Sequence, residues 1–359
     1  MDTTPPLRPA ALFARLAIIG IILGSVAGLF AFVGGWLSPW QLTPSRFIDT
    51  FEQINGPHPG FRRNHAKGVC IRGWFESNGA GAEFSKAAVF APSRVPVIGR
   101  FALAGGQPFV TDAPGTVRSM ALLFHLPDGE EWRTGINNIP VFPVRTPEEF
   151  RDQMLANAPD PTTGKPDPEK AKAFLASHPD TARAMQQILS RPISTGFANS
   201  TYHSLNAFHF IDAKGRVTPV RWAMVPEQAF VPIDKSDPGK SDKNYLFDAL
   251  IADIHHAPQK WHLIVTIGEP GDPTHDATVT WPAGRRTIDV GTLVIDQVES
   301  EDISPARDIN FDPLILPNGI AGSDDPLLSA RSAAYSQSFT RREGERKIPS
   351  AVSTAETAK

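Results

Sequence analysis

Proline and glycine interrupt this chain so often that they limit its fold more than any other feature. The 359 residues include 34 prolines and 28 glycines, and the proline content is well above its usual share of roughly 5%. Because proline breaks helix interiors and glycine weakens them, helical bundles and coiled coils are excluded for most of the chain. Hydrophobic residues still make up 41% of the sequence. We therefore expect short strands and short helices around a real core.

One long uninterrupted stretch lies near the amino terminus. Residues 17–36, AIIGIILGSVAGLFAFVGGW, contain no charged side chain, and a helix of this length spans a hydrocarbon core of about 30 Å. Arg8 and Arg15 precede the stretch, and the first basic residue after it is Arg46. The positive-inside rule then places residues 1–16 in the cytoplasm. We expect a transmembrane anchor at 17–36, with the rest of the chain in the periplasm.

A cleaved signal peptide is the alternative interpretation of this stretch. Ser25 and Ala27 offer the small-x-small pattern of a cleavage site. Cleavage there would leave the apolar residues 28–36 on the mature chain, so we favour an uncleaved anchor on the length of the stretch.

The remaining sequence mixes strand and helix patterns without regular alternation. Apolar residues at helical spacing predict helices at 46–55 and 245–254, and proline opens two further helical segments at 147–158 and 168–190. Short runs rich in Val, Ile, Phe and Ala between breakers predict strands at 66–76, 85–91, 98–104, 118–126, 205–224, 261–267 and 287–297. The fold class is therefore α+β with an antiparallel sheet or barrel. We expect one domain at 40–345 and a polar, disordered tail at 346–359.

Charge and cysteine content exclude several classes of function. The 35 basic and 38 acidic side chains give a formal charge of −3, which argues against a nucleic-acid partner. The single cysteine, Cys70, cannot form a disulfide within the chain, nor supply a zinc finger or a cysteine-ligated iron–sulfur cluster.

A first chemical signal lies near the carboxyl end, where Arg331 precedes Tyr335 by four residues. On a helix the two side chains share one face. A guanidinium that keeps its proton stabilises a neighbouring phenolate, and a phenolate is a hard, anionic ligand for ferric iron. Alone the spacing is weak, because most such pairs belong to ordinary amphipathic helices.

Several segments change this assessment, because they occur in the order and with the local sequence of one family. The chain resembles the haem catalases, and more closely the short, single-domain catalase-related peroxidases. The resemblance runs from about Arg46 to Arg342, some four fifths of the chain, and rests on HAKG and GWFE, RFA at 100–102, FVTDAPGTVRSMALLF, NNIPVF, and FDPLILPNGI leading to RSAAY. It implies an antiparallel β-barrel with surrounding helices, a bound haem b, and a monomer or homodimer.

The resemblance also implies roles for individual residues. His65 matches the distal histidine, Asn137 the distal asparagine and Tyr335 the iron ligand. Arg331 matches the arginine that holds the phenolate, and Asp325 matches an acid that supports this arginine. The other haem contacts that it implies are Arg62, Arg100 and Arg342 for the propionates and Phe142 and Phe150 for the distal face. An imidazole that is neutral near physiological pH can accept and return a proton, and an amide can orient a peroxide.

The chain also departs from the family pattern. Ala102 stands where most catalases carry a distal serine, Ile136 replaces a glycine, and Asn206 replaces a histidine near the proximal arginine. These changes predict an altered peroxide pocket. Only 24 residues follow Tyr335, so the carboxy-terminal extension of larger catalases and its NADPH site have no counterpart. We expect a haem more open to reductants.

The predicted function is peroxidase turnover. Hydrogen peroxide, or an organic peroxide, would be reduced with an external organic electron donor, with weak catalase activity beside it. The alternatives are a true minimal catalase that dismutates hydrogen peroxide, and a membrane-anchored extracytoplasmic barrel that binds a ligand without catalysis. A metallohydrolase built from Asp253, His255, His256 and His262 is disfavoured, because the adjacent histidines point apart and no HExxH pattern accompanies them.

Overall fold

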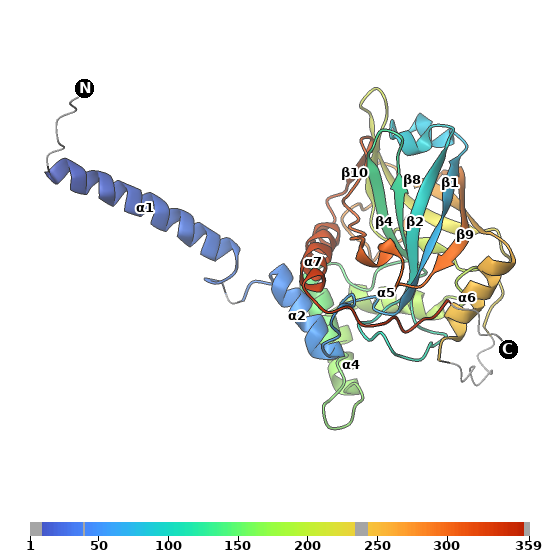
Figure 1. Ribbon diagram of the computed structural model, residues 1–359, viewed down its shortest axis with the longest axis horizontal. Helices are drawn as coiled ribbons and strands as arrows, with labels where there is room; N and C mark the ends of the chain where they lie inside the picture. The colour runs from blue at the N-terminus through green and yellow to red at the C-terminus, as the bar shows by residue number, and fades with distance from the viewer. Residues whose placement is uncertain (1–8, 39, 234–242, 355–359) are drawn as a thin grey trace. The chain divides into compact units, whose positions relative to one another are not determined.

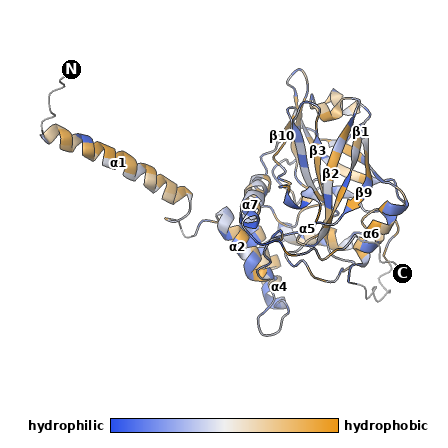
Figure 2. Ribbon diagram, in the orientation of Figure 1, coloured by the Kyte–Doolittle hydropathy of each residue, from blue (hydrophilic) through white to orange (hydrophobic). Residues whose placement is uncertain are grey.

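A computed structural model describes residues 9–38, 40–233 and 243–354, and the chain divides into two units, 1–47 and 48–359. In the first unit, helix α1 (Pro9–Val33) contains the predicted apolar stretch up to its last three residues, Gly34 to Trp36, and is hydrophobic along almost its whole length (Figure 2). It is long and apolar enough to cross a membrane, as a signal sequence would also be. Residues 1–8 of the predicted cytoplasmic segment lie outside the described residues.

The second unit is built on one antiparallel sheet (Figure 1). In the described residues the sheet order is β10-β6-β7-β5-β4-β3-β2-β1-β9-β8, and a further pairing of β7 with β8 closes eight strands into a barrel. The strands are β1 (Gly68–Ser77), β2 (Arg94–Leu103), β3 (Arg118–His125), β4 (Glu131–Asn137), β5 (Tyr202–His203), β6 (Phe208–Ile211), β7 (Val217–Pro226), β8 (Gln259–Ile267), β9 (Thr287–Glu299) and β10 (Ile320–Gly322). The predicted α+β barrel is confirmed.

Helices surround this barrel and begin where the sequence places caps. Proline follows the capping side chains of Thr146, Asp167 and Asp325, whose oxygens accept backbone N–H groups of the first turn. The α-helices besides α1 are α2 (Pro44–Asn55), α3 (Pro147–Ala156), α4 (Pro168–Ser177), α5 (Pro179–Ser190), α6 (Tyr245–His256) and α7 (Pro326–Glu343). Three short 3₁₀ helices are η1 (Ala80–Glu83), η2 (Ala88–Phe90) and η3 (Pro305–Asp308).

Three sequence predictions of secondary structure need correction. The segment 168–190 is two helices, because Pro179 starts a new helix after His178. The expected strand at 85–91 contains the 3₁₀ helix η2, since its apolar side chains are buried without a strand partner in the described sheet. The run 205–224 folds into the two strands β6 and β7, which pair through a turn at Gly215 with φ 79°.

Alternation along the strands fixes which side chains enter the barrel. In β4, Trp132, Thr134 and Ile136 are buried, and they alternate with Gly135 and Asn137 on the other face. Aromatic rings fill much of the interior, with Trp132 stacked on Phe124 at 4.7 Å between ring centroids. Because one face of each strand is committed to this core, the outer face of β1 to β4 is left for other elements to cover.

The carboxy-terminal tail differs from the disordered segment expected from its polarity. Residues 346–354 run along the domain, where the carbonyl of Ile348 accepts a hydrogen bond from Arg307 (2.6 Å). Val352 is only 1% exposed and packs in the main core. The prediction from polar composition overlooked the single apolar residue that anchors this segment. Residues 355–359 lie outside the described residues.

A buried ion pair ties the start of β1 to α6. Lys67 Nζ lies 2.7 Å from Asp112 Oδ1, and Asp112 Oδ2 accepts the backbone N–H of Leu246 (2.9 Å). Burial lowers the pKa of Lys67. Removing one partner leaves the other charge buried, so Lys67→Met is expected to lower the free energy of unfolding by about 3–5 kcal/mol.

Urea unfolding followed by circular dichroism would measure this loss. The double variant Lys67→Met/Asp112→Asn removes both charges while keeping an acceptor for Leu246, and should regain part of the stability. Equal stability of the wild type and Lys67→Met would contradict the expected contribution of the pair.

Candidate active site

The candidate site lies on the outer face of β1 to β4. Strand register places Gly68, Ala102, Ser119, Asn137 and His203 in one row across five strands. A second row runs through Cys70, Arg100, Ala121 and Gly135. Small side chains dominate both rows, so groups from the loop before β1 and from α7 can approach the sheet closely.

His65 reaches the first row from the loop before β1. Its backbone has φ 57°, a left-handed conformation that is unusual for a residue other than glycine. Asn64 Oδ1 stabilises this turn by accepting the N–H groups of His65 (2.9 Å) and Gly105 (2.8 Å). Strain held in place by neighbouring groups is typical of functional sites.

Ser119 joins His65 to Asn137. Its Oγ lies 2.9 Å from His65 Nδ1 and donates a hydrogen bond to Asn137 Oδ1. The sequence predicted His65 and Asn137 but missed Ser119. The available signal was the strand register, because Ser119 stands directly opposite both Ala102 and Asn137.

This contact changes how two of the departures are interpreted. The hydroxyl missing at Ala102 is replaced from the neighbouring strand by Ser119. Ile136 is fully buried in the main core, on the barrel side of β4, so its side chain does not face the site. The prediction that Ile136 alters the pocket is therefore wrong. At Ala102, the loss of the hydroxyl is compensated by Ser119.

Tyr335 and Arg331 approach the second row from α7. A Cβ built on Gly135 would lie 3.0 Å from the Tyr335 hydroxyl and 3.5 Å from Arg331 Nη2, so both groups converge on this glycine. Arg331 Nη2 donates to the carbonyl of Gly135 (2.8 Å). The phenol and the guanidinium therefore approach the same point of the sheet from one helix.

Asn206 connects Arg331 to the acid at the start of α7. It accepts a hydrogen bond from Arg331 Nη1 and donates to Asp325 Oδ2 (2.8 Å). Asp325 also caps α7 by accepting the N–H of Leu327 (2.9 Å). Asp325 therefore contacts Arg331 only indirectly, through the side chain of Asn206.

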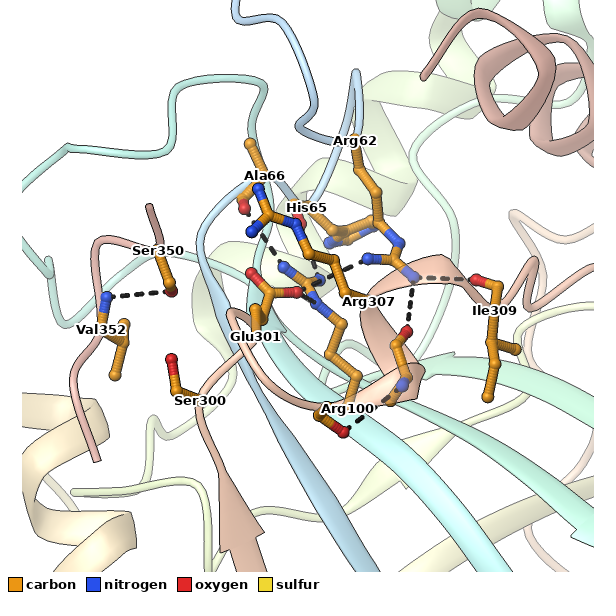
Figure 3. A network of polar contacts seen from close by, with 12 residues as sticks. Arg62, His65, Ala66, Arg100, Ser300, Glu301, Arg307, Ile309, Ser350 and Val352 are labelled. Carbon is orange, nitrogen blue, oxygen red and sulfur yellow. Dashed lines mark hydrogen bonds and ion pairs between the residues drawn. The ribbon is translucent and has the colours of Figure 1, made fainter. Parts of the chain in front are cut away.

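Two of the predicted arginines, Arg62 and Arg100, pair with the carboxylate of Glu301 (Figure 3), and the third, Arg342, lies within the influence of its charge. Glu301 Oε1 lies 2.5 Å from Arg100 Nε and 3.5 Å from Arg62 Nη1. Arg342 is 4% exposed, and burial together with the charge of Arg100 lowers the pKa of Arg342 to about 10. Burial, Arg342 and Arg100 likewise lower the pKa of Arg62. The cluster thus holds more positive than negative charge away from water.

The predicted aromatic pair lies together as well. Phe142 and Phe150 pack edge to face with ring centroids 5.2 Å apart, and Phe150 also contacts Phe51 of α2 at 6.1 Å. Phe142 lies beside a small core that includes Val141 and Leu205. The rings form an apolar wall.

The surroundings keep His65 uncharged. Burial, followed by the positive charges of Arg100 and Arg331, lowers the pKa of His65 to about 3. Burial also lowers the pKa of His203, opposite Asn137, to about 4. Both imidazoles are therefore neutral at physiological pH. Because the charge of Arg331 on α7 contributes to the lowered pKa of His65, the two parts of the site are close enough to interact electrostatically.

These lowered pKa values predict weaker folding in mild acid. Below the ordinary histidine pKa of about 6.5, these histidines become protonated in the unfolded chain. In the folded chain they stay neutral until the pH approaches their lowered pKa values. The lowered pKa of His203 alone should therefore reduce the free energy of unfolding by up to about 2 kcal/mol between pH 7 and pH 5. Urea titrations at both pH values should show a smaller loss for His203→Gln than for the wild type; equal losses would contradict the assignment.

The disfavoured metal site gains no support. Among the described residues no group of three or more His, Cys, Asp or Glu side chains is placed to hold a metal ion. The imidazole of His262 instead lies beside the carboxylates of Glu227 (3.3 Å) and Asp289 (2.8 Å).

The fold and the site together define a closed antiparallel barrel with a histidine–serine–asparagine group on one outer face, where a phenol and a guanidinium also converge on Gly135. The sequence model of the catalase family matches residues 37–354. The chain therefore belongs to the catalase family, as its motifs predicted.

Two relatives of known class show which branch of the family this chain resembles. A catalase-related peroxidase of Synechococcus elongatus is 34% identical over 324 residues, covering 90% of this chain and 96% of the relative. Another, from Mycolicibacterium paratuberculosis, is 33% identical, covering 84% and 96%. The predicted likeness to catalase-related peroxidases is confirmed.

Solved structures share the fold at lower identity. A fungal catalase superimposes with a TM-score of 0.73 at 19% identity, and a bacterial catalase with 0.71 at 22%. Each match covers 83% of this chain but only 63% and 60% of the solved chains. The protein thus spans less than two thirds of the length of these catalases.

Proposed function

We propose that this protein is a haem-dependent peroxidase that reduces hydrogen peroxide, or organic peroxides, with a small organic electron donor. The observation that carries the proposal is the outer face of the barrel, where Tyr335 with Arg331 and His65 with Asn137 occupy neighbouring strand rows. Membership of the catalase family and similarity to catalase-related peroxidases support it.

The residues present fit a haem. Arg62, Arg100 and Arg342 are buried or nearly so, and Glu301 is the carboxylate that pairs with Arg62 and Arg100. The two propionates of a haem would offset this excess of positive charge. Tyr335 lies at Gly135, where any other side chain would press on the phenol. Phe142 and Phe150 offer apolar contact to a macrocycle. Bound haem would supply the iron and the electrons for cleavage of the peroxide O–O bond.

The chain's own residues would then manage protons and charge. Neutral His65 accepts a proton from one peroxide oxygen and returns it to the other. The Asn137 amide donates a hydrogen bond that orients the peroxide. The guanidinium of Arg331, close to Tyr335 at Gly135, would offset the negative charge of an iron-bound phenolate, while Asn206 and Asp325 hold that guanidinium in place.

Peroxidase turnover is proposed ahead of dismutation because two relatives that match this chain over 96% of their own length are catalase-related peroxidases. We further propose that α1 anchors the protein and that the barrel lies in the periplasm, on the positive-inside distribution of arginines. A monomer or homodimer is proposed.

The test is to purify the full chain with haem supplied, record its ferric spectrum, and add hydrogen peroxide with and without a phenol donor. A tyrosinate-type spectrum, with donor oxidation faster than oxygen release, is the expected result. Rapid oxygen release without a donor would identify a minimal catalase. Failure to bind haem would leave the anchored ligand-binding barrel as the better description.

A further inference from the structure

Ser119 contacts both residues that the proposed mechanism uses on the peroxide side. We infer that Ser119 is a positioning residue that leaves Nε2 of His65 as the proton acceptor and turns the N–H₂ group of Asn137 toward the peroxide. This inference rests on the proposed function and deepens it.

The argument begins from the single proton of the Ser119 hydroxyl. Asn137 Oδ1 carries no proton, so the hydroxyl donates to it. Ser119 Oγ can then only accept from His65 Nδ1, 2.9 Å away, and Nδ1 must carry the ring proton. A neutral imidazole with its proton on Nδ1 has its free electron pair on Nε2. The serine therefore selects the tautomer.

The same hydrogen bond orients the amide. With Oδ1 of Asn137 bound to Ser119, the N–H₂ group is directed elsewhere and can donate to a ligand. Two functions that need opposite polarity, a base and a donor, are thus fixed by one hydroxyl group. The strand pairing enforces this, since Ser119 and Asn137 are directly opposite each other on β3 and β4.

The position of the hydroxyl explains why it can serve both residues. Ala102 lies on β2, one strand further from Asn137, and neighbouring strands are about 4.8 Å apart. A serine at 102 would therefore stand about 10 Å from the asparagine's backbone. Moving the hydroxyl to β3 adds a coupling between His65 and Asn137 that a serine at Ala102 could not provide directly.

Cyanide binding to the haem-loaded full chain tests this role without relying on turnover. Hydrogen cyanide must lose its proton as its carbon binds ferric iron, and His65 Nε2 is the acceptor for that proton, with no change in oxidation state. Carbon monoxide binds ferrous iron without proton transfer. We expect Ser119→Ala to slow cyanide binding by roughly 10- to 100-fold, the usual effect of a lost supporting partner, and to leave carbon monoxide binding within a factor of about three.

A matched pair of variants separates the hydroxyl from the shape of the side chain. Ser119→Thr keeps the hydroxyl and Ser119→Val has the same branched shape without it. Thr should bind cyanide at close to the wild-type rate, and Val should resemble Ala. Unchanged cyanide binding in Ala and Val, or equal losses in Thr and Val, would overturn the inference.

Haem content distinguishes this failure from failure of the proposed function. A wild-type chain that takes up no haem would refute the function itself. Haem-loaded variants with unchanged cyanide kinetics would refute only the role of Ser119.

Discussion

Replacing Tyr335 with phenylalanine is expected to yield a folded barrel that no longer retains haem. The phenol oxygen is the heavy atom nearest to a Cβ built on Gly135, and Arg331 Nη2 is the next nearest. Removing a supporting partner of a metal ligand typically costs 10- to 100-fold in affinity, roughly, and removing the ligand itself should cost more. Haem content after saturation and gel filtration, together with the ferric spectrum, would measure the loss.

Tyr202 provides a matched control. Its hydroxyl donates to the carbonyl of Phe197 (2.9 Å) inside the barrel, and burial raises the pKa of Tyr202, so this phenol stays neutral. Tyr202→Phe should lose about 1 kcal/mol of stability and retain full haem content. Full occupancy and an unchanged spectrum in Tyr335→Phe would refute the ligand assignment.

Much of the fold was predictable because its causes are local. Apolar runs between proline and glycine identified most barrel strands, and an opening proline marked α3 and α4. The segment containing η2 was misassigned because a short apolar run is equally consistent with a buried 3₁₀ turn. Closure of the barrel by β7 and β8 is a pairing between distant strands, which periodicity does not encode.

The candidate site was predictable only where family motifs carry it. Arg331 and Tyr335 share a helix face through their spacing, but Arg62, Arg100 and Arg342 come from three separate segments and meet only in the folded chain. Ser119 was missed because its role depends on which residue stands across the strand pair. A loss at Ala102 and its compensation at Ser119 are 17 positions apart in sequence and adjacent in register.

The second large effect is expected for His65→Ala. This variant should bind haem normally, because the proposed contacts to it come from Tyr335, the arginine cluster and the phenylalanines. Peroxide should then be consumed roughly 10²- to 10⁴-fold more slowly, the usual loss for an acid–base group. Stopped-flow mixing of the haem-loaded chain with hydrogen peroxide would measure the rate directly.

The pH dependence of that rate adds a test of the same residue. Because burial and the charges of Arg100 and Arg331 lower the pKa of His65 to about 3, the imidazole remains an available base throughout the physiological range. The wild-type rate should therefore stay flat from about pH 8 to pH 5 and fall only as pH approaches the pKa of His65. His125 is the control, because it is exposed and lies at the end of β3 opposite to Ser119. His125→Ala should show the wild-type rate and pH dependence. A wild-type rate that halves near pH 6.5 would mean that His65 titrates normally, and an undiminished rate in His65→Ala would remove it from the mechanism.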